Sequence, residues 1–176
     1  KKVLDIGCNN GVFSDAAISS GAEFSIGIDN DTSSIDDAFL MAKKKSINFL
    51  PLYLNILNPS PSIGWLNKER KNFSERFHQT FDGIICLACI HHICIGNNVP
   101  INQFLKYLNN FSKFILLEFV PKEDQMVINM LANKKDIYDN YNIDFFKKEI
   151  DKLYTTIWQE KIPGTKRTIF ALKKND

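Results

Sequence analysis

The chain has 176 residues and contains no apolar run close to the roughly 20 residues that cross a bilayer. It also lacks a clear excess of either charge, because 22 lysines and arginines stand against 20 acidic residues. Proteins that bind nucleic acid or a membrane surface normally carry a clear basic excess. We therefore expect neither nucleic acid nor a membrane among the partners.

Cysteine is scarce, with four residues at positions 8, 86, 89 and 94. The first residues, KKVLDIGC, run directly into a strand pattern with no signal peptide, so we expect a cytoplasmic chain with buried, reduced cysteines. Cys86 and Cys89 lie in one strand-like run and should point to opposite faces, which argues against a shared metal ion. Because the sequence begins directly with a strand pattern, an N-terminal cap segment could be missing.

Apolar strand patterns alternate with helical patterns along the whole chain. The expected strands are residues 3–6, 24–29, 52–56, 81–90, 114–120, 155–162 and 167–174; the expected helices are residues 12–20, 31–45, 63–77, 98–108, 124–135 and 142–154. This order predicts an α/β fold with a doubly wound, mainly parallel seven-stranded sheet, helices on both faces and a C-terminal antiparallel hairpin. No repeat or linker interrupts the pattern, so we expect one domain over residues 1–176.

A glycine-containing loop, DIGCNNG, follows the first strand. Gly7 and Gly11 allow a tight turn and a close approach of the backbone to a ligand. The helix that follows presents free N–H groups, which favour a carboxylate or a phosphate. The dinucleotide pattern G-x-G-x-x-G is absent, and Asp5 would repel a pyrophosphate. The loop instead suits a ligand that carries an ammonium group beside its carboxylate.

This loop resembles the first motif of the class I S-adenosylmethionine-dependent methyltransferases, acid-x-Gly-x-Gly-x-Gly. Asp5, Gly7 and Gly11 match the motif, and Asn9 stands in place of the middle glycine. The resemblance implies the Rossmann-like fold, S-adenosylmethionine as cofactor and cofactor contacts from this loop, Cys8 and Asn9 included. The alternative is a glycine turn that serves only to pack a strand against a helix.

Polar residues follow the second and third expected strands. Asp29 ends the second strand, where a carboxylate can accept hydrogen bonds from vicinal ribose hydroxyls; the alternative is a solvated strand end or a helix cap. Asp31 is the expected N-cap of the next helix. The resemblance adds Asn30 to the cofactor contacts, and it places Asn55 at the adenine amino group and Ile56 on the adenine face. Asn55 could equally cap the loop that follows it.

The fourth strand ends in Leu87, Ala88, Cys89 and Ile90, followed by His91 and His92. The resemblance implies that the backbone at Leu87 and Ala88 lies near the methionine part of the cofactor. A histidine is a suitable general base for a hydroxyl substrate, and the pattern does not choose between the two; a strand-end cap is the alternative. The neighbouring cysteines and histidines are too close in sequence to converge on one tetrahedral metal site, so we expect no metal.

The predicted function is methyl transfer from S-adenosylmethionine to a small-molecule acceptor, with a hydroxyl oxygen as the expected target. The sequence (D/N)PP(Y/F), typical of enzymes that methylate amino nitrogens of nucleic-acid bases or protein amides, is absent. Two alternatives stay open: a non-catalytic, methyltransferase-like scaffold or cofactor-binding module of a larger protein with additional domains, and an NAD(P)-dependent oxidoreductase.

We further expect Glu118 to hold a substrate hydroxyl or to pair with Lys122 or Arg167, and Trp65 and Trp158 to lie in or near the core.

Overall fold

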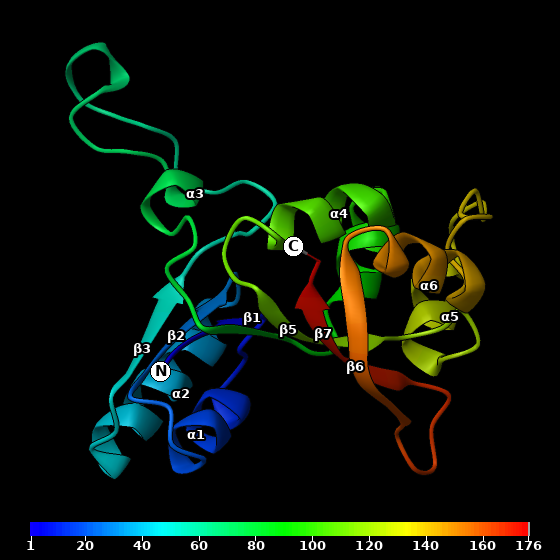
Figure 1. The fold of residues 1–176 in the computed structure, drawn as a ribbon, viewed down its shortest axis with the longest axis horizontal. Helices are drawn as coiled ribbons and strands as arrows, with labels where there is room; N and C mark the ends of the chain where they lie inside the picture. The colour runs from blue at the N-terminus through cyan, green and yellow to red at the C-terminus, as the bar shows by residue number, and fades with distance from the viewer. Residues whose placement is uncertain (176) are drawn as a thin grey trace. The chain divides into compact units, whose positions relative to one another are not determined.

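A computed structural model describes residues 1–175 of the chain. Its seven strands form a sheet in the order β3-β2-β1-β4-β5-β7-β6, which confirms the predicted α/β architecture (Figure 1). The chain divides into two compact units. The first unit comprises Lys1–Ile85 and Asn110–Ser112, and the second comprises Cys86–Asn109 and Lys113–Asp176. The single domain expected over residues 1–176 stays a prediction.

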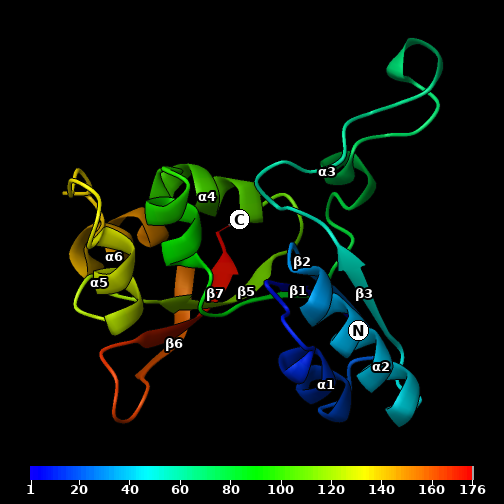
Figure 2. The ribbon, with the colours of Figure 1, turned by 180° about the vertical axis from the view of Figure 1, so that it is seen from behind.

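The first unit contains the parallel part of the sheet. Its elements are β1 (Lys2–Ile6), α1 (Val12–Ser19), β2 (Phe24–Asp29), α2 (Thr32–Lys45), β3 (Phe49–Tyr53), the 3-10 turn η1 (Trp65–Asn67), α3 (Phe73–Arg76) and all of β4 (Gly83–Cys86) except its last residue. β1 pairs in parallel with β2 and β4, and β2 pairs in parallel with β3. The helices α1 and α2 pack against strands of this unit, as both ribbon views show (Figures 1 and 2).

The second unit contains the antiparallel strands. Its elements are the π-helix η2 (His92–Gly96), α4 (Ile101–Leu108), β5 (Phe114–Phe119), α5 (Gln125–Leu131), α6 (Ile143–Asp151), β6 (Tyr154–Lys161) and β7 (Thr168–Lys174). β7 pairs antiparallel with both β5 and β6. The C-terminal hairpin predicted from the sequence is therefore confirmed.

Each unit has a core that follows the apolar periodicity of its helices. In the first unit, Ala38 and Ala42 of α2 pack with Cys8 and Phe49. In the second, α4 buries one face through residues spaced three and four apart, namely Ile101, Phe104, Leu105 and Leu108. Within residues 1–175, no helix combines the length and the hydropathy that crossing a membrane requires.

The prediction of a helix over residues 63–77 is wrong. Ile63 instead forms an isolated antiparallel bridge with Arg70, and the α-helix is limited to α3. Gly64 has φ of 87°, and Leu66 and Asn67 also lie in the left-handed region, so a continuous helix cannot form there. Figure 1 shows this segment as a loop that extends beyond α3.

Two expectations about the tryptophans are also wrong. Trp65 is 77% exposed on the extended loop, and Trp158 is 46% exposed on β6. Trp158 belongs to the strand at the edge of the sheet, which has a neighbouring strand on one side alone. Size and aromaticity favour burial in general, but the position of each residue in the fold decides it.

Two strands end earlier than predicted. β4 stops at Cys86, and Ala88 has φ of 51°, which breaks the extended backbone expected to Ile90. β3 spans Phe49–Tyr53, so Asn55 and Ile56 lie beyond the strand rather than at its last residues. The connections after both strands therefore begin earlier in the chain than the sequence indicates.

Candidate functional site

The loop after β1 wraps onto the next strand. The backbone N–H groups of Gly7 and Cys8 both donate to the Ile28 carbonyl oxygen, at 2.8 and 3.1 Å. Gly7, Asn9 and Gly11 have φ angles of 73°, 47° and 85°, all in the left-handed region. Asparagine tolerates this conformation better than most side chains, which explains how Asn9 occupies the place of a glycine.

Gly11 and Cys8 face the interior of the first unit. A Cβ atom on Gly11 would lie 2.5 Å from Phe49 Cε1 and 2.8 Å from Met41 Cε, so the missing side chain makes room for these two residues. The Cys8 side chain is 2% exposed and belongs to the same core. Either residue can therefore contact a ligand through its backbone atoms alone.

Asp29, at the end of β2, is held in place by two backbone donors. Its Oδ2 accepts a hydrogen bond from Asn9 N at 2.9 Å, and its Oδ1 accepts one from Asp31 N at 3.0 Å. The Asn9 side chain also donates to Ser34 Oγ at 3.3 Å, which ties the loop to α2. Asp29 is half-buried and Asn30 is exposed, so both can reach a ligand at this strand end.

The structure also confirms Asp31 as the N-cap of α2. Its side chain accepts a hydrogen bond from Ser34 N at 3.0 Å, which satisfies one of the free donors of the first turn. The cap and the carboxylate of Asp29 thus serve different donors. Asp29 remains the acid that faces the loop after β1.

Asp5 lies deeper, with 1% exposure. Its Oδ2 accepts a hydrogen bond from Ser14 Oγ at 2.8 Å, and Ser14 Oγ in turn accepts one from Ser25 Oγ at 3.1 Å. Burial raises the pKa of Asp5 to about 6. The hydrogen bonds with Ser14 lower this pKa in part, and the negative charge of Asp29 raises it slightly. A cation placed beside this carboxyl would favour its ionised form.

Asn55 is exposed and already engaged in the loop after β3. Its Oδ1 accepts a hydrogen bond from Leu57 N at 2.9 Å, and its backbone carbonyl accepts one from Asn58 N at 3.1 Å. The loop-capping contact anticipated for Asn55 is thus present. Ile56 next to it is half-buried.

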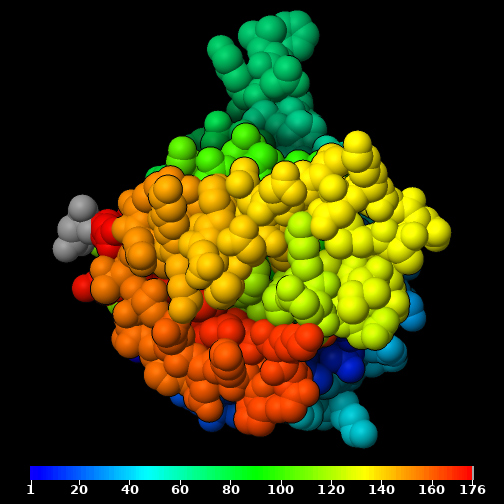
Figure 3. All heavy atoms as spheres, turned by 90° about the vertical axis from the view of Figure 1, so that its right-hand side faces the viewer, coloured from blue at the N-terminus to red at the C-terminus, as the bar shows by residue number. Residues whose placement is uncertain are grey.

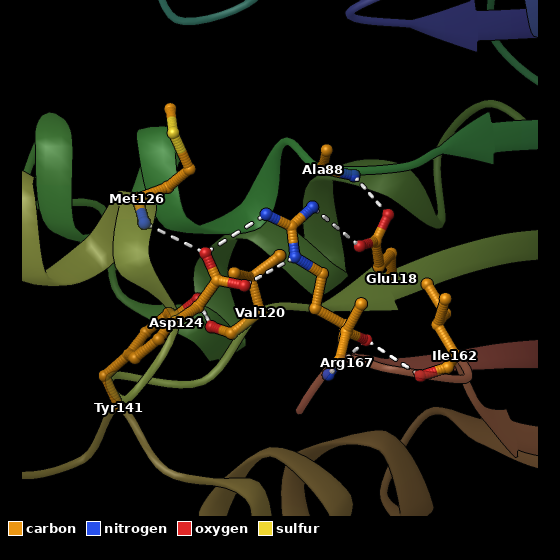
Figure 4. A network of polar contacts seen from close by, with 9 residues as sticks. Ala88, Glu118, Val120, Asp124, Met126, Tyr141, Ile162 and Arg167 are labelled. Carbon is orange, nitrogen blue, oxygen red and sulfur yellow. Dashed lines mark hydrogen bonds and ion pairs between the residues drawn. The ribbon is translucent and has the colours of Figure 1, made fainter.

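In the second unit, a network of charged groups fixes the chain after β4 (Figure 4). Ala88 N donates to Glu118 Oε2 at 2.8 Å, and Glu118 Oε1 lies 3.2 Å from Arg167 Nη1. Arg167 also binds Asp124 through two hydrogen bonds of 2.6 and 3.1 Å. Of the two partners considered for Glu118, the structure thus has Arg167; Lys122 pairs with Asp136 instead.

The network reaches a helix end as well. Asp124 is the N-cap of α5 and accepts a hydrogen bond from Met126 N at 3.0 Å. The hydrogen bonds with Arg167 lower the pKa of Asp124 and raise the pKa of Arg167, so both groups stay charged at neutral pH. Sequence reasoning missed Asp124. The one available signal was its position directly before an apolar helical pattern.

His91, the residue directly before η2, is buried, with 1% exposure. Neither of its ring nitrogens has a hydrogen-bond partner within residues 1–175. Burial lowers the pKa of His91 to about 4, and the positive charges of His92 and Arg167 lower it further, while Asp124 opposes them. Its ring centroid lies 4.1 Å from that of the exposed His92. At neutral pH, His91 is therefore uncharged and keeps a nitrogen that can accept a proton.

No protein-family model matches the chain. The nodulation protein NoeA of Rhizobium meliloti (strain 1021) is 40% identical to it over 176 residues, which are 100% of this chain and 37% of that protein. The chain thus spans little more than a third of the length of this curated relative.

Solved structures resemble the chain over nearly its full length. The PH0226 protein from Pyrococcus horikoshii OT3 matches with a TM-score of 0.68 and 18% identity, covering 99% of this chain and 82% of that chain. The bifunctional kinase-methyltransferase WbdD matches with a TM-score of 0.64 and 20% identity, covering 98% of this chain and 34% of that chain. Together with the strand order, these likenesses show that the chain has a Rossmann-like α/β fold, which it shares with PH0226 and with part of the kinase-methyltransferase WbdD.

Proposed function

We propose that this chain binds S-adenosylmethionine and transfers its methyl group to a hydroxyl oxygen of a small-molecule acceptor. The observation that carries the proposal is the carboxylate of Asp29, held at the end of β2 by the backbone N–H groups of Asn9 and Asp31. A carboxylate fixed in this way retains lone pairs that can accept hydrogen bonds from two vicinal hydroxyls.

The donor and acceptor groups of the first unit fit this cofactor. Asp29 and Asn30 would bind the ribose, and the backbone of Gly7, Cys8, Asn9 and Gly11 would line the amino-acid part. Asp5, whose pKa burial raises to about 6, would gain from a nearby ammonium group. Asn55 and Ile56 would lie by the adenine, and the backbone of Leu87 and Ala88 by the methionine part.

When bound, S-adenosylmethionine supplies a methyl group already activated by a positive sulfur. The protein then has to orient the acceptor and to exclude water. His91 is the group that we propose for the hydroxyl proton, since both of its ring nitrogens lack a hydrogen-bond partner within residues 1–175. His92, exposed beside it, would pass the proton to solvent.

A small molecule is the acceptor class that the charge favours. The formal net charge is +2, and large nucleic-acid substrates normally require a basic surface. Within residues 1–175, none of the four cysteines forms a disulfide, in keeping with the proposed location in the cytoplasm. Methylation of RNA by the chain would contradict the acceptor part of the proposal and leave the cofactor part intact.

Isothermal titration with S-adenosylhomocysteine tests the cofactor site. We expect saturable binding to the wild-type chain, and binding about tenfold weaker for Asp29→Asn, because one of the two acceptor oxygens is lost. Asp37→Asn is the matched control, since it removes an exposed carboxylate of α2 without touching the loop. Equal affinity of the wild type and Asp29→Asn, or absence of binding, would overturn the proposed cofactor site.

A further inference from the structure

The second unit contains a cavity of about 560 Å³, and none of the residues proposed to bind the cofactor lines it. Three segments line it: Cys94 of η2 with residues 98–100, the first turn of α4, and residues 137–141 with Phe145 of α6. This volume lies within the range of small-molecule binding sites. Figure 3 shows the segment before α6 (yellow) and α6 itself (orange-yellow) side by side on one face.

Aromatic rings form one part of the wall. The hydroxyl of Tyr138 donates a hydrogen bond to the Ile95 carbonyl oxygen at 2.9 Å, and that of Tyr141 donates to the Val120 carbonyl oxygen at 2.7 Å. Because both hydroxyls are bound to backbone, the rings are fixed and present flat apolar surface. Tyr141 is buried against Phe119, whereas Tyr138 and Phe145 are half-buried and accessible from the cavity.

Amide side chains form the polar part of the wall. Within residues 1–175, the side chains of Asn102, Gln103 and Asn140 make no hydrogen bond, although all three line the cavity. Each amide offers two donor hydrogens and an accepting oxygen, so it can satisfy a hydroxyl group in either direction. Three such groups at one cavity provide a surface for a ligand with several hydroxyls.

The charge of the lining selects among polar ligands. Asp139 is the one charged side chain among the described lining residues, and no lysine or arginine is present there. A phosphate or carboxylate ligand would therefore find no cationic partner and would be repelled by Asp139. A neutral ligand with hydroxyl groups and an apolar face fits the aromatic and amide groups together.

We propose that this cavity binds a neutral carbohydrate, with the C–H face of a sugar ring on Tyr138 and its hydroxyls on the amides. Resting on the proposed function, the inference names carbohydrate as the class of the methyl acceptor. The link within the second unit is η2, which begins at His92, directly after His91, and contributes Cys94 to the cavity wall. π-Helical turns are frequent at functional sites.

The test is direct binding to the full chain without a methyl donor. Saturation-transfer NMR would use cellobiose, maltose and N-acetyllactosamine as neutral probes, and glucose 6-phosphate as the anionic probe. We expect saturable binding of at least one neutral disaccharide, weakened about three- to tenfold by Tyr138→Ala. Tyr138→Phe should keep most of the affinity because it keeps the ring, and Asn102→Ala with Gln103→Ala should weaken binding about fivefold or more.

Trp158→Ala is the matched control, since it deletes an exposed aromatic side chain outside the cavity and should leave binding unchanged. Lack of binding of all three neutral probes, tighter binding of glucose 6-phosphate, or wild-type affinity of Tyr138→Ala would each overturn the carbohydrate site. A parallel titration with S-adenosylhomocysteine separates the two proposals. Saccharide binding without nucleoside binding supports the cavity and overturns the methyltransferase, and nucleoside binding alone does the reverse.

Discussion

Asp5 combines 1% exposure with a raised pKa of about 6, against an ordinary value of 3.8. The folded state therefore holds the proton of this carboxyl more tightly than the unfolded state does. Its contribution to stability is fully present below pH 3.8 and is lost as the pH rises through about 6. The difference corresponds to about 3 kcal/mol at neutral pH.

The substitution Asp5→Asn should therefore stabilise the chain at pH 7.5, by up to about 3 kcal/mol, and have little effect at pH 3.5. The amide oxygen can still accept the hydrogen bond from Ser14, so the packing is preserved. Urea unfolding at both pH values measures the difference. A lower stability of Asp5→Asn than of the wild type at pH 7.5 would contradict the effect of burial.

The same variant links stability to function. If Asp5 faces the ammonium group of S-adenosylmethionine, Asp5→Asn should weaken S-adenosylhomocysteine binding while it stabilises the free protein. Opposite effects on stability and binding are characteristic of a residue retained for function. Asp37→Asn, an exposed carboxylate, should change neither quantity.

His91 gives a second prediction at this scale. Because burial lowers its pKa to about 4, its imidazole should stay neutral through the range in which an ordinary histidine titrates, near 6.5. NMR titration of the three imidazole signals measures this, and the spectrum of His91→Gln assigns the signal of His91. A midpoint near 6.5 for His91 would show that solvent reaches the ring.

Local residue roles were predictable from sequence, and non-local ones were not. The cap formed by Asp31 depends on a backbone donor three residues away, so the local pattern was enough. The glycine at position 11 depends on Phe49 and Met41, which come from β3 and α2. Sequence spacing around the loop holds no information about those two side chains.

At the scale of elements, the position of the chain after β4 depends on Arg167, the residue directly before β7. Replacing it with glutamine would leave Glu118, with 6% of its side chain exposed, without a cation. We expect Arg167→Gln to lower the free energy of unfolding by roughly 2–4 kcal/mol. Adding Glu118→Gln should recover part of the loss, because the unpaired charge is then removed.

Urea unfolding of the two single variants and the double variant measures the coupling. Lys122→Gln is the control, since the Lys122–Asp136 pair is more exposed and should contribute no more than about 1 kcal/mol. Strict additivity of Arg167→Gln and Glu118→Gln would show that the two groups do not act as a unit. The contact between Arg167 and Glu118 drawn in Figure 4 would then add nothing to the free energy of unfolding.

Elements with a continuous apolar face were predicted well. The pattern of α4 places four apolar residues on one face, and all four are buried. The segment 63–77 has a similar spacing but contains Gly64 and two further left-handed residues, and Phe73 is its one buried side chain among the described residues. Apolar spacing predicts a helix well when the apolar face can be covered by the rest of the protein, as in α4. In residues 63–77, the left-handed backbone conformations prevent the helix that the spacing predicts.

For the whole molecule, the alternation of strands and helices was sufficient to predict the sheet and its C-terminal hairpin. Parallel strands require crossover connections, which leaves few ways to arrange such a chain. The predicted ends of β1 and β2 match the structure, whereas those of β3 and β4 do not. The bond between Arg167 and Asp124 joins residues 43 positions apart, a separation at which sequence pattern gives no pairing.

The response of the whole chain to ligands distinguishes the three functions considered from its sequence. A ligand that binds the folded state alone stabilises it by about 2.7 kcal/mol at one hundred times its dissociation constant. For a chain of this size, that amounts to a rise of roughly 5–10 °C in Tm. We expect S-adenosylhomocysteine to give this rise and NADH to give none, because the loop after β1 lacks the pattern for a pyrophosphate and Asp5 lies at its start. A rise with NADH alone would indicate an oxidoreductase, and no rise with either ligand would indicate a scaffold with the same fold.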